Sequence, residues 1–293
     1  MDAWLASLRG APSGWCSEEG GAKGFAHLGV YKRMLELGIP VDYVGGTSIG
    51  AIMAACIAMD LPYSELYRLT RASFVEDRVL ADRTVPLVSY YGGRRLERGL
   101  QRGFGQRDLE DLWINFYCVS SNLSRAGMVV HRRGLLWRWV RASISLPGAF
   151  PPVVSGDDLL VDGGVMNNLP VDVMADLGVH RIYAVNLSAE KPYTLGYERV
   201  PGTLQLLRNR FAPKAKKLKV PGLMTIITKS IMLASYQRMG EVQDRAFQIL
   251  TPPVQHMSLL DFKKLDEGIR LGYDYATQVL EAPTETPNAG GVS

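Results

Sequence analysis

Cysteine is scarce in this chain of 293 residues. The three cysteines, Cys16, Cys56 and Cys118, are odd in number and far apart in the sequence. This excludes a small domain held together by disulfides, and it excludes a zinc site built from closely spaced thiols. The cysteine usage suits a reducing compartment, so we expect a cytoplasmic protein.

Long apolar runs are also missing. No stretch of 18 uncharged apolar residues occurs, so we expect no transmembrane helix. Residues 1–9 are too short and too mixed to act as a signal peptide. The basic residues do not alternate with stacking aromatic side chains, and we therefore expect no nucleic-acid partner. With 47% hydrophobic residues, the chain can bury a core of the size found in α/β enzymes.

The most informative motif that is present is Gly46-Thr47-Ser48-Ile49-Gly50. The strand-forming residues 41–44 precede it, and the apolar residues 49–58 that follow predict a buried helix. A G-x-S-x-G sequence between a strand and a helix is typical of a nucleophile elbow, in which Gly46 and Gly50 allow the two backbones to approach. On this motif alone, a strand-to-helix turn with a capping serine explains the pattern equally well.

Asp162 is the candidate base, 114 residues after Ser48. It follows the predicted strand 159–161 and precedes a turn at Gly163 and Gly164. Burial would raise the pKa of a carboxyl at this position and make it a better base for a hydroxyl. The competing interpretations are an aspartate that caps its own turn and a triad with a histidine. We favour a Ser48–Asp162 dyad, because no clear relation to Ser48 is found for His27, His131, His180 or His256.

A glycine-rich loop, Gly20-Gly21-Ala22-Lys23-Gly24, opens the first predicted helix. Glycines before a helix let backbone N–H groups point at an anion. Such a loop could form an oxyanion hole or a phosphate site, although neither a P-loop nor an intact G-x-G-x-x-G motif is present.

Four segments in this order resemble the patatin-like phospholipase family: GGAKGFAHLGVYK, GGTSIGAIMAA, SISLPGAFPPVV and LLVDGGVMNNLPVDV. The stretches from Asp108 to Gly148 and from Leu259 to Glu281 are similar to the branch that contains neuropathy target esterase. The resemblance runs from about Gly20 to Glu281, nearly the whole chain.

This resemblance implies an α/β fold with a mostly parallel central sheet flanked by helices, as in patatin and cytosolic phospholipase A2. It implies that Ser48 is the nucleophile and Asp162 the base, and that the amides of Gly20 and Gly21 form the oxyanion hole. Lys23, beside Gly24, would steady the loop or a substrate phosphate. The implied substrates are phospholipids or lysophospholipids, and no metal or other cofactor is implied.

The start of the chain departs from the family pattern. Glu18 and Glu19 stand before the glycines, and position 19 is a glycine in the family. Residues 10–17 contain Pro12 and two glycines, which predicts that the first strand is missing. Either the beginning of the sequence is altered, or the protein is a weakened or inactive relative that binds lipid or a partner.

The expected organisation is an atypical lead-in (1–19), a single hydrolase domain (20–281) and a disordered tail (282–293). Within the domain we expect a catalytic core (20–188), then a basic flap and C-terminal helices (189–281). Residues 208–233 join a basic run to an apolar segment, and two interpretations are open. One is peripheral membrane contact, and the other, which we favour by about two to one, is a solvated loop followed by a core helix. The sequence leaves the oligomeric state open.

Overall fold

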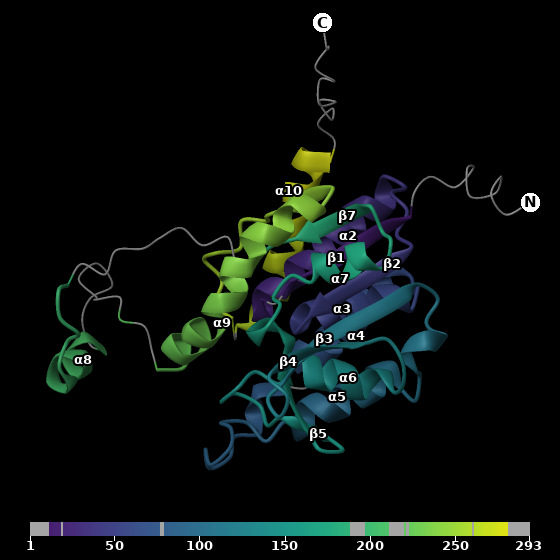
Figure 1. Cartoon of the computed structure of the whole chain (residues 1–293). Helices are drawn as coiled ribbons and strands as arrows, with labels where there is room; N and C mark the ends of the chain where they lie inside the picture. The colour runs from purple at the N-terminus through teal and green to yellow at the C-terminus, as the bar shows by residue number, and fades with distance from the viewer. Residues whose placement is uncertain are drawn as a thin grey trace, which may run out of the picture.

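The fold is a computed structural model that describes residues 12–18, 20–76, 79–187, 197–210, 220, 223–259 and 261–280. Eight strands form one sheet, in which β5, β6, β3, β2, β1, β7 and β8 are each hydrogen-bonded to the next and β4 also pairs with β3 (Figure 1). The central pairs are parallel, and the pairs at the β3 side are antiparallel. This confirms the predicted α/β class. The strands are β1 Ser13–Ser17, β2 Tyr43–Thr47, β3 Asn115–Asn122, β4 Gly127–His131, β5 Val153–Ser155, β6 Asp158–Asp162, β7 Arg181–Val185 and β8 Gln248–Leu250.

The prediction that the first strand is missing was wrong. Ser13–Ser17 forms β1, which lies between β2 and β7, and its Trp15 and Cys16 are fully buried. Pro12 precedes the strand, so it takes no hydrogen bond from the ladder. Gly14 suits this central position because a Cβ there would come within 2.2 Å of the Met174 sulfur. Close packing against the helix that contains Met174, rather than strand propensity, therefore explains the glycine at position 14.

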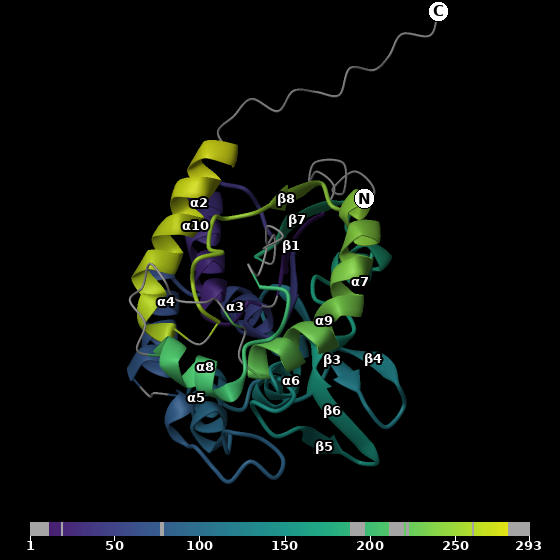
Figure 2. The same cartoon turned by 90° about the vertical axis from the view of Figure 1, so that its left-hand side faces the viewer.

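Helices cover both faces of the sheet (Figure 2). Alternate strand residues face opposite sides, so Trp15 belongs to one apolar core and Cys16 to the other. The core around Trp15 is covered by α2 Ala26–Glu36, α3 Ile49–Ala58, α4 Tyr63–Arg71, α5 Arg94–Phe104, α6 Leu136–Ser143 and α10 Leu265–Leu280. The core around Cys16 is covered by α7 Val171–Asp176 and contacted by α9 Leu223–Val242. Short helical turns are η1 Gly21–Phe25, η2 Ala72–Glu76, η3 Val79–Ala81, η4 Leu109–Asp111, η5 Gly163–Val165, η7 Gln243–Arg245 and η8 Phe262–Lys264.

The helix after the serine motif, α3, is buried at all ten positions, as its apolar sequence predicts. Within the described ranges, no helix is both long enough and apolar enough to cross a membrane.

Parts of the predicted flap and tail lie outside the described residues, namely 188–196, 211–219, 221–222 and 281–293. Within the predicted basic flap, Thr203–Arg210 forms the helix α8. Leucine and arginine favour a helix here despite the polar surroundings.

The register of β3 brings the carboxyl ends of β2 and β6 together. Strand β2 pairs with residues 115–119 of β3, β4 pairs with 118–122, and β6 pairs with 120–122. Each residue of β3 can pair on two edges only. Strand β4 occupies one edge of β3 along residues that also pair with β2 and with β6, so both β2 and β6 lie on the opposite edge of β3. Thr47 is opposite Val119 and Asp162 is opposite Ser120, the next residue along.

Candidate active site

Ser48 stands between β2 and α3 in a conformation that L-residues seldom adopt, with φ 56° and ψ −126°. Such strain persists only where the surroundings hold it, and here the Ser48 N–H donates to Ser143 Oγ at 3.0 Å. The turn places Ser48 before the first residue of a buried helix, where the free N–H groups favour negative charge. The strand–turn–helix context expected for the motif is therefore present.

The glycines around Ser48 are needed because three backbones meet there. A Cβ on Gly46 would lie 2.7 Å from the carbonyl carbon of Gly50, and a Cβ on Gly50 would lie 2.6 Å from the oxygens of Ser17 and Glu18. Gly24 is equally constrained, since a Cβ there would lie 2.4 Å from the Ile49 side chain. The elbow is thus packed directly against β1 and the glycine-rich loop.

Asp162 is fully buried at the end of β6. Its N–H donates to the Ser145 carbonyl at 3.1 Å, and its Oδ1 accepts from the Gly164 N–H at 2.8 Å. Gly163 packs against β3, where a Cβ would lie 2.2 Å from the Val119 oxygen. The position of the carboxyl is therefore set by backbone contacts on both sides of it.

Burial raises the pKa of Asp162 to about 7, and hydrogen bonding from Gly164 and from the Ser48 hydroxyl limits the rise. The Oδ2 atom is buried without a well-aligned hydrogen-bond partner. A serine hydroxyl turns about its Cβ–Oγ bond, so the proton of Ser48 can be directed at the Asp162 carboxyl.

The glycine-rich loop lies beside the serine. Gly21 has a φ of 52° and lines the same cavity as Ser48, and a Cβ on it would collide with the Leu259 carbonyl oxygen at 2.2 Å. That oxygen accepts the Ala22 N–H at 2.8 Å. Gly20 fits against the Leu187 side chain, and Lys23 is buried. The loop is thus held close to Ser48 by the segment that precedes α10.

Glu18 is fully buried at the end of β1. Its carboxylate accepts hydrogen bonds from the Asn168 side chain and the Leu187 N–H. Its carbonyl oxygen lies 3.0 Å from His27 Nε2. The Glu18 side chain is therefore held by hydrogen-bond donors from two other segments of the core. Glu19 lies outside the described residues.

All four histidines are described, and no hydrogen bond joins any of them to Ser48 or Asp162. His27 binds the Glu18 carbonyl, and His131 Nε2 lies 2.7 Å from Ser120 Oγ. Burial lowers the pKa of both imidazoles to about 4. His256 pairs with Glu267 near the surface, and His180 is exposed.

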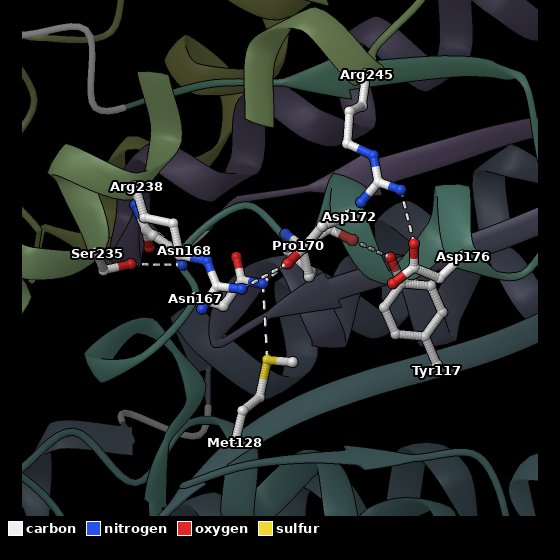
Figure 3. Close-up of polar contacts among 10 residues, drawn as sticks. All are labelled: Tyr117, Met128, Asn167, Asn168, Pro170, Asp172, Asp176, Ser235, Arg238 and Arg245. Carbon is white, nitrogen blue, oxygen red and sulfur yellow. Dashed lines mark hydrogen bonds and ion pairs between the residues drawn. The ribbon is translucent and has the colours of Figure 1, made fainter. Parts of the chain in front are cut away.

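A polar network links residues 167–172, which follow Asp162 in the chain, to α9 (Figure 3). Asn167 donates from its side chain to Asp172 Oδ1 at 2.7 Å and accepts Thr47 Oγ1 at its carbonyl at 2.9 Å. Arg238 of α9 reaches the other oxygen of Asp172 at 3.1 Å. The backbone N–H of Asn168 donates to Ser235 Oγ at 2.7 Å.

Sequence reasoning missed this network and the two serines that brace the site, Ser143 and Ser145. Both serines fall in the SISLPGAFPPVV segment, which resembles the family, although no role was assigned to either. No local pattern marks them, because the site residues that they contact, Ser48 and Asp162, are 95 and 17 residues away in the chain.

An apolar cavity of about 70 Å³ opens beside Ser48. A second cavity of about 20 Å³ adjoins it, and the two share Ile52, Phe74, Val79 and Leu96. A larger groove of about 680 Å³ lies elsewhere, at the amino ends of β2 and β3, where His131, Arg132 and Arg133 line it. The lining beside Ser48 suits an apolar group bound next to a nucleophile.

A model of the patatin-like phospholipase family matches residues 20–175, more than half of the chain. The chain is 33% identical to "Lysophospholipase NTE1" of Kluyveromyces lactis in an alignment 296 residues long that covers 98% of this chain and 20% of that protein. It is 35% identical to "Patatin-like phospholipase domain-containing protein 7" of Rattus norvegicus in an alignment 265 residues long that covers 87% of this chain and 20% of that protein. The chain therefore spans about a fifth of the length of these curated relatives.

Among solved structures, VipD from Legionella pneumophila has a similar fold, with a TM-score of 0.50 and 13% sequence identity. The match covers 92% of this chain and 66% of VipD. At this identity the likeness concerns the fold alone.

Proposed function

This chain belongs to the patatin-like phospholipase family, and on that premise we propose that it is a serine lipid acyl hydrolase with a Ser48–Asp162 dyad. The observation that carries the proposal is the junction of β2 and β6 on one edge of β3. It brings a strained serine and a buried carboxyl of raised pKa side by side.

In the proposed reaction Asp162 accepts the proton of the Ser48 hydroxyl while Ser48 Oγ attacks the acyl carbonyl. The N–H groups of Gly20 and Gly21 hold the oxyanion of the tetrahedral intermediate. Collapse releases the alcohol, which takes the proton from Asp162, and leaves the acyl group on Ser48. Water then attacks this ester while Asp162 again accepts a proton, and the bond from the acyl carbon to Ser48 Oγ breaks. Ser48 Oγ takes the proton back from Asp162, and the fatty acid leaves.

The proposed substrates are lysophospholipids and phospholipids. This choice of substrates rests on the names of two curated relatives, one called a lysophospholipase and the other a patatin-like phospholipase domain-containing protein. The apolar cavity beside Ser48 would take part of an acyl chain, and Lys23 would stabilise the loop or a substrate phosphate. We further propose that the protein works in the cytoplasm at the surface of a membrane.

The alternative is an inactive relative that binds lipid or a partner. Its main support was the carboxylates before the glycine-rich loop and the absent first strand. The strand is present, and the Glu18 carboxylate is bound by Asn168 and Leu187. Both findings favour the enzyme.

The test is labelling with a fluorophosphonate probe, with Ser48→Ala as the control. We expect Ser48 Oγ to displace fluoride in the wild type and no labelling in the variant. Because the base must be deprotonated, the labelling rate should rise with pH through about 7, the pKa of Asp162. A folded wild-type protein that fails to label would favour the inactive alternative.

A further inference from the structure

An apolar loop projects from the molecule between η3 and α5. Val85, Leu87 and Val88 at its tip are 72%, 89% and 67% exposed. The base of the loop is closed by Thr84 N–H to the Tyr90 carbonyl (3.0 Å) and Gly92 N–H to the Asp82 carbonyl (2.8 Å). The tip is therefore held outward by a defined hairpin. Three large apolar side chains on one exposed tip are uncommon on a surface that faces only water.

The loop is bonded to the wall of the cavity that contains Ser48. Tyr90 and Tyr91 donate their N–H groups to the carbonyls of Gly148 and Ala149, at 2.8 and 3.0 Å. The Tyr91 ring packs on Phe150, with ring centres 5.6 Å apart, and Phe150 lines that cavity. The exposed tip and the entrance to the candidate site thus belong to one connected surface.

Positive charge lies next to this tip. Helix α5 exposes Arg94, Arg95, Arg98 and Arg102. Arg95, Arg98 and Arg102 are three and four residues apart and so lie along one side of the helix, with Arg94 beside them. Between positions 82 and 102 five arginines accompany only two acidic residues, Asp82 and Glu97. Figures 1 and 2 both place the loop and α5 together at the lower end of the molecule.

We propose that the surface formed by Val85–Val88 and the arginines of α5 docks on an anionic phospholipid bilayer. The apolar tip enters the interface and the arginines contact the headgroups, which presents the cavity beside Ser48 to the lipid. The choice of lipid as the partner rests on the proposed function. The charge of α5 favours an anionic surface over an uncharged one.

This location differs from the membrane contact predicted at residues 208–233. Of that segment, residues 211–219 and 221–222 lie outside the described residues. In α9, Thr228, Met232 and Ser235 are buried on one side of the helix, so that side packs on the protein. The loop at 85–88 has no such packing at its tip.

The test is co-sedimentation of the 293-residue chain with vesicles of phosphatidylcholine alone or with 30% phosphatidylglycerol. The protein carries Ser48→Ala so that lipid is not consumed. We expect binding to the anionic vesicles and about tenfold or greater weakening by Leu87→Ser/Val88→Ser, from the loss of two buried apolar side chains. Arg95→Gln/Arg98→Gln should weaken binding by more than tenfold at low salt, and 0.5 M salt should remove most of that difference.

Two control variants match these changes away from the proposed surface. Trp113→Ser removes a side chain that is 85% exposed, just before the amino end of β3. Arg132→Gln/Arg133→Gln removes two exposed charges next to β4. The proposal requires both control variants to bind like the parent. It is overturned if they weaken binding as much as the loop and α5 variants, or if the parent binds both vesicle types equally or not at all.

Hydrolysis is measured separately, on a short water-soluble ester and with Ser48 restored. We expect Leu87→Ser/Val88→Ser to retain the wild-type rate on this substrate, because neither side chain lines the cavity. Failure of all proteins to hydrolyse the ester would refute the proposed function without affecting the vesicle result. Concentration-dependent dimerisation abolished by Leu87→Ser/Val88→Ser, without vesicle binding, would instead identify a second copy as the partner.

Discussion

Asp162 combines an ionisable group with complete burial, which makes it costly to charge. Its pKa of about 7 lies well above the value near 3.9 expected in the unfolded chain. The folded state therefore binds this proton more tightly than the unfolded state does. The stabilisation is complete below the unfolded pKa and is lost as the pH rises through about 7.

We expect Asp162→Asn to be inactive and yet more stable than the wild type at high pH. The amide carries no charge and can still accept the Gly164 N–H. The gain in free energy of unfolding should be on the order of 3 kcal/mol at pH 8.5 and should vanish near pH 4. Thermal unfolding of both proteins at the two pH values measures it. A difference that does not change with pH would contradict the buried, raised-pKa carboxyl.

Glu18 is the second residue whose role depends on burial. Glu18→Ala leaves the Asn168 side chain and the Leu187 N–H without their acceptor, and each such loss costs about 1–3 kcal/mol. The glycine-rich loop follows directly, so probe labelling should slow as well. The two donors bond to different oxygens of Glu18, and Glu18→Gln keeps one of them for the Leu187 N–H. The Asn168 amide can turn its own oxygen toward the new NH2 group, so this variant should recover most of the stability and labelling rate. Equal behaviour of the alanine and glutamine variants would refute this role.

At the scale of elements, the site depends on how closely β1, β2 and α3 approach one another. Gly50→Ala should destabilise the protein by more than 2 kcal/mol, because its Cβ would meet two backbone oxygens at 2.6 Å. Gly103→Ala, in α5, is the matched control, since nothing lies within 4 Å of its Cβ. It should be neutral or stabilising by about 0.5–1 kcal/mol. Denaturant unfolding distinguishes the two.

The elements that the sequence predicts are those with a strong local pattern. The apolar run 49–58 and the motif around Ser48 specify α3 and its turn, and 159–161 specifies β6. Strand β1 was missed because Gly14 and Pro12 oppose a strand locally, whereas packing against Met174 requires the glycine. The contacts of Ser143, Ser145, Asn167 and Asn168 depend on tertiary structure, so no spacing in the sequence indicates them.

At the scale of the whole molecule, the last described helix packs on the first. A Cβ on Gly29 of α2 would lie 1.9 Å from the Ile269 oxygen, and a Cβ on Gly272 of α10 would lie 2.1 Å from the Ala26 oxygen. Tyr273 donates to Glu36 at 2.8 Å. The carbonyl of Leu259, in the segment before α10, accepts the Ala22 N–H of the glycine-rich loop. The packing of α10 on α2 therefore also affects the position of this loop.

We therefore expect Gly272→Ala to affect both stability and the site. Separating the helix backbones should cost about 1–3 kcal/mol, and the shift of Leu259 should slow probe labelling. Gly240→Ala in α9, with nothing within 4 Å of its Cβ, is the control and should lower neither the stability nor the labelling rate. Loss of stability with an unchanged labelling rate would show that α10 supports the fold but not the loop.

The turn at Ser48 has a consequence beyond exposing a hydroxyl. Strand β2 stops pairing with β3 at Thr47, which is opposite Val119. The next residue of β3 on that edge, Ser120, can therefore pair with Asp162. A β2 longer by one residue would occupy the place of the base. We therefore expect one-residue insertions in the β3–β4 turn at residues 123–126 to preserve activity, and an insertion at the end of β2 to abolish it. The length of β2 thus decides whether Asp162 can lie next to Ser48.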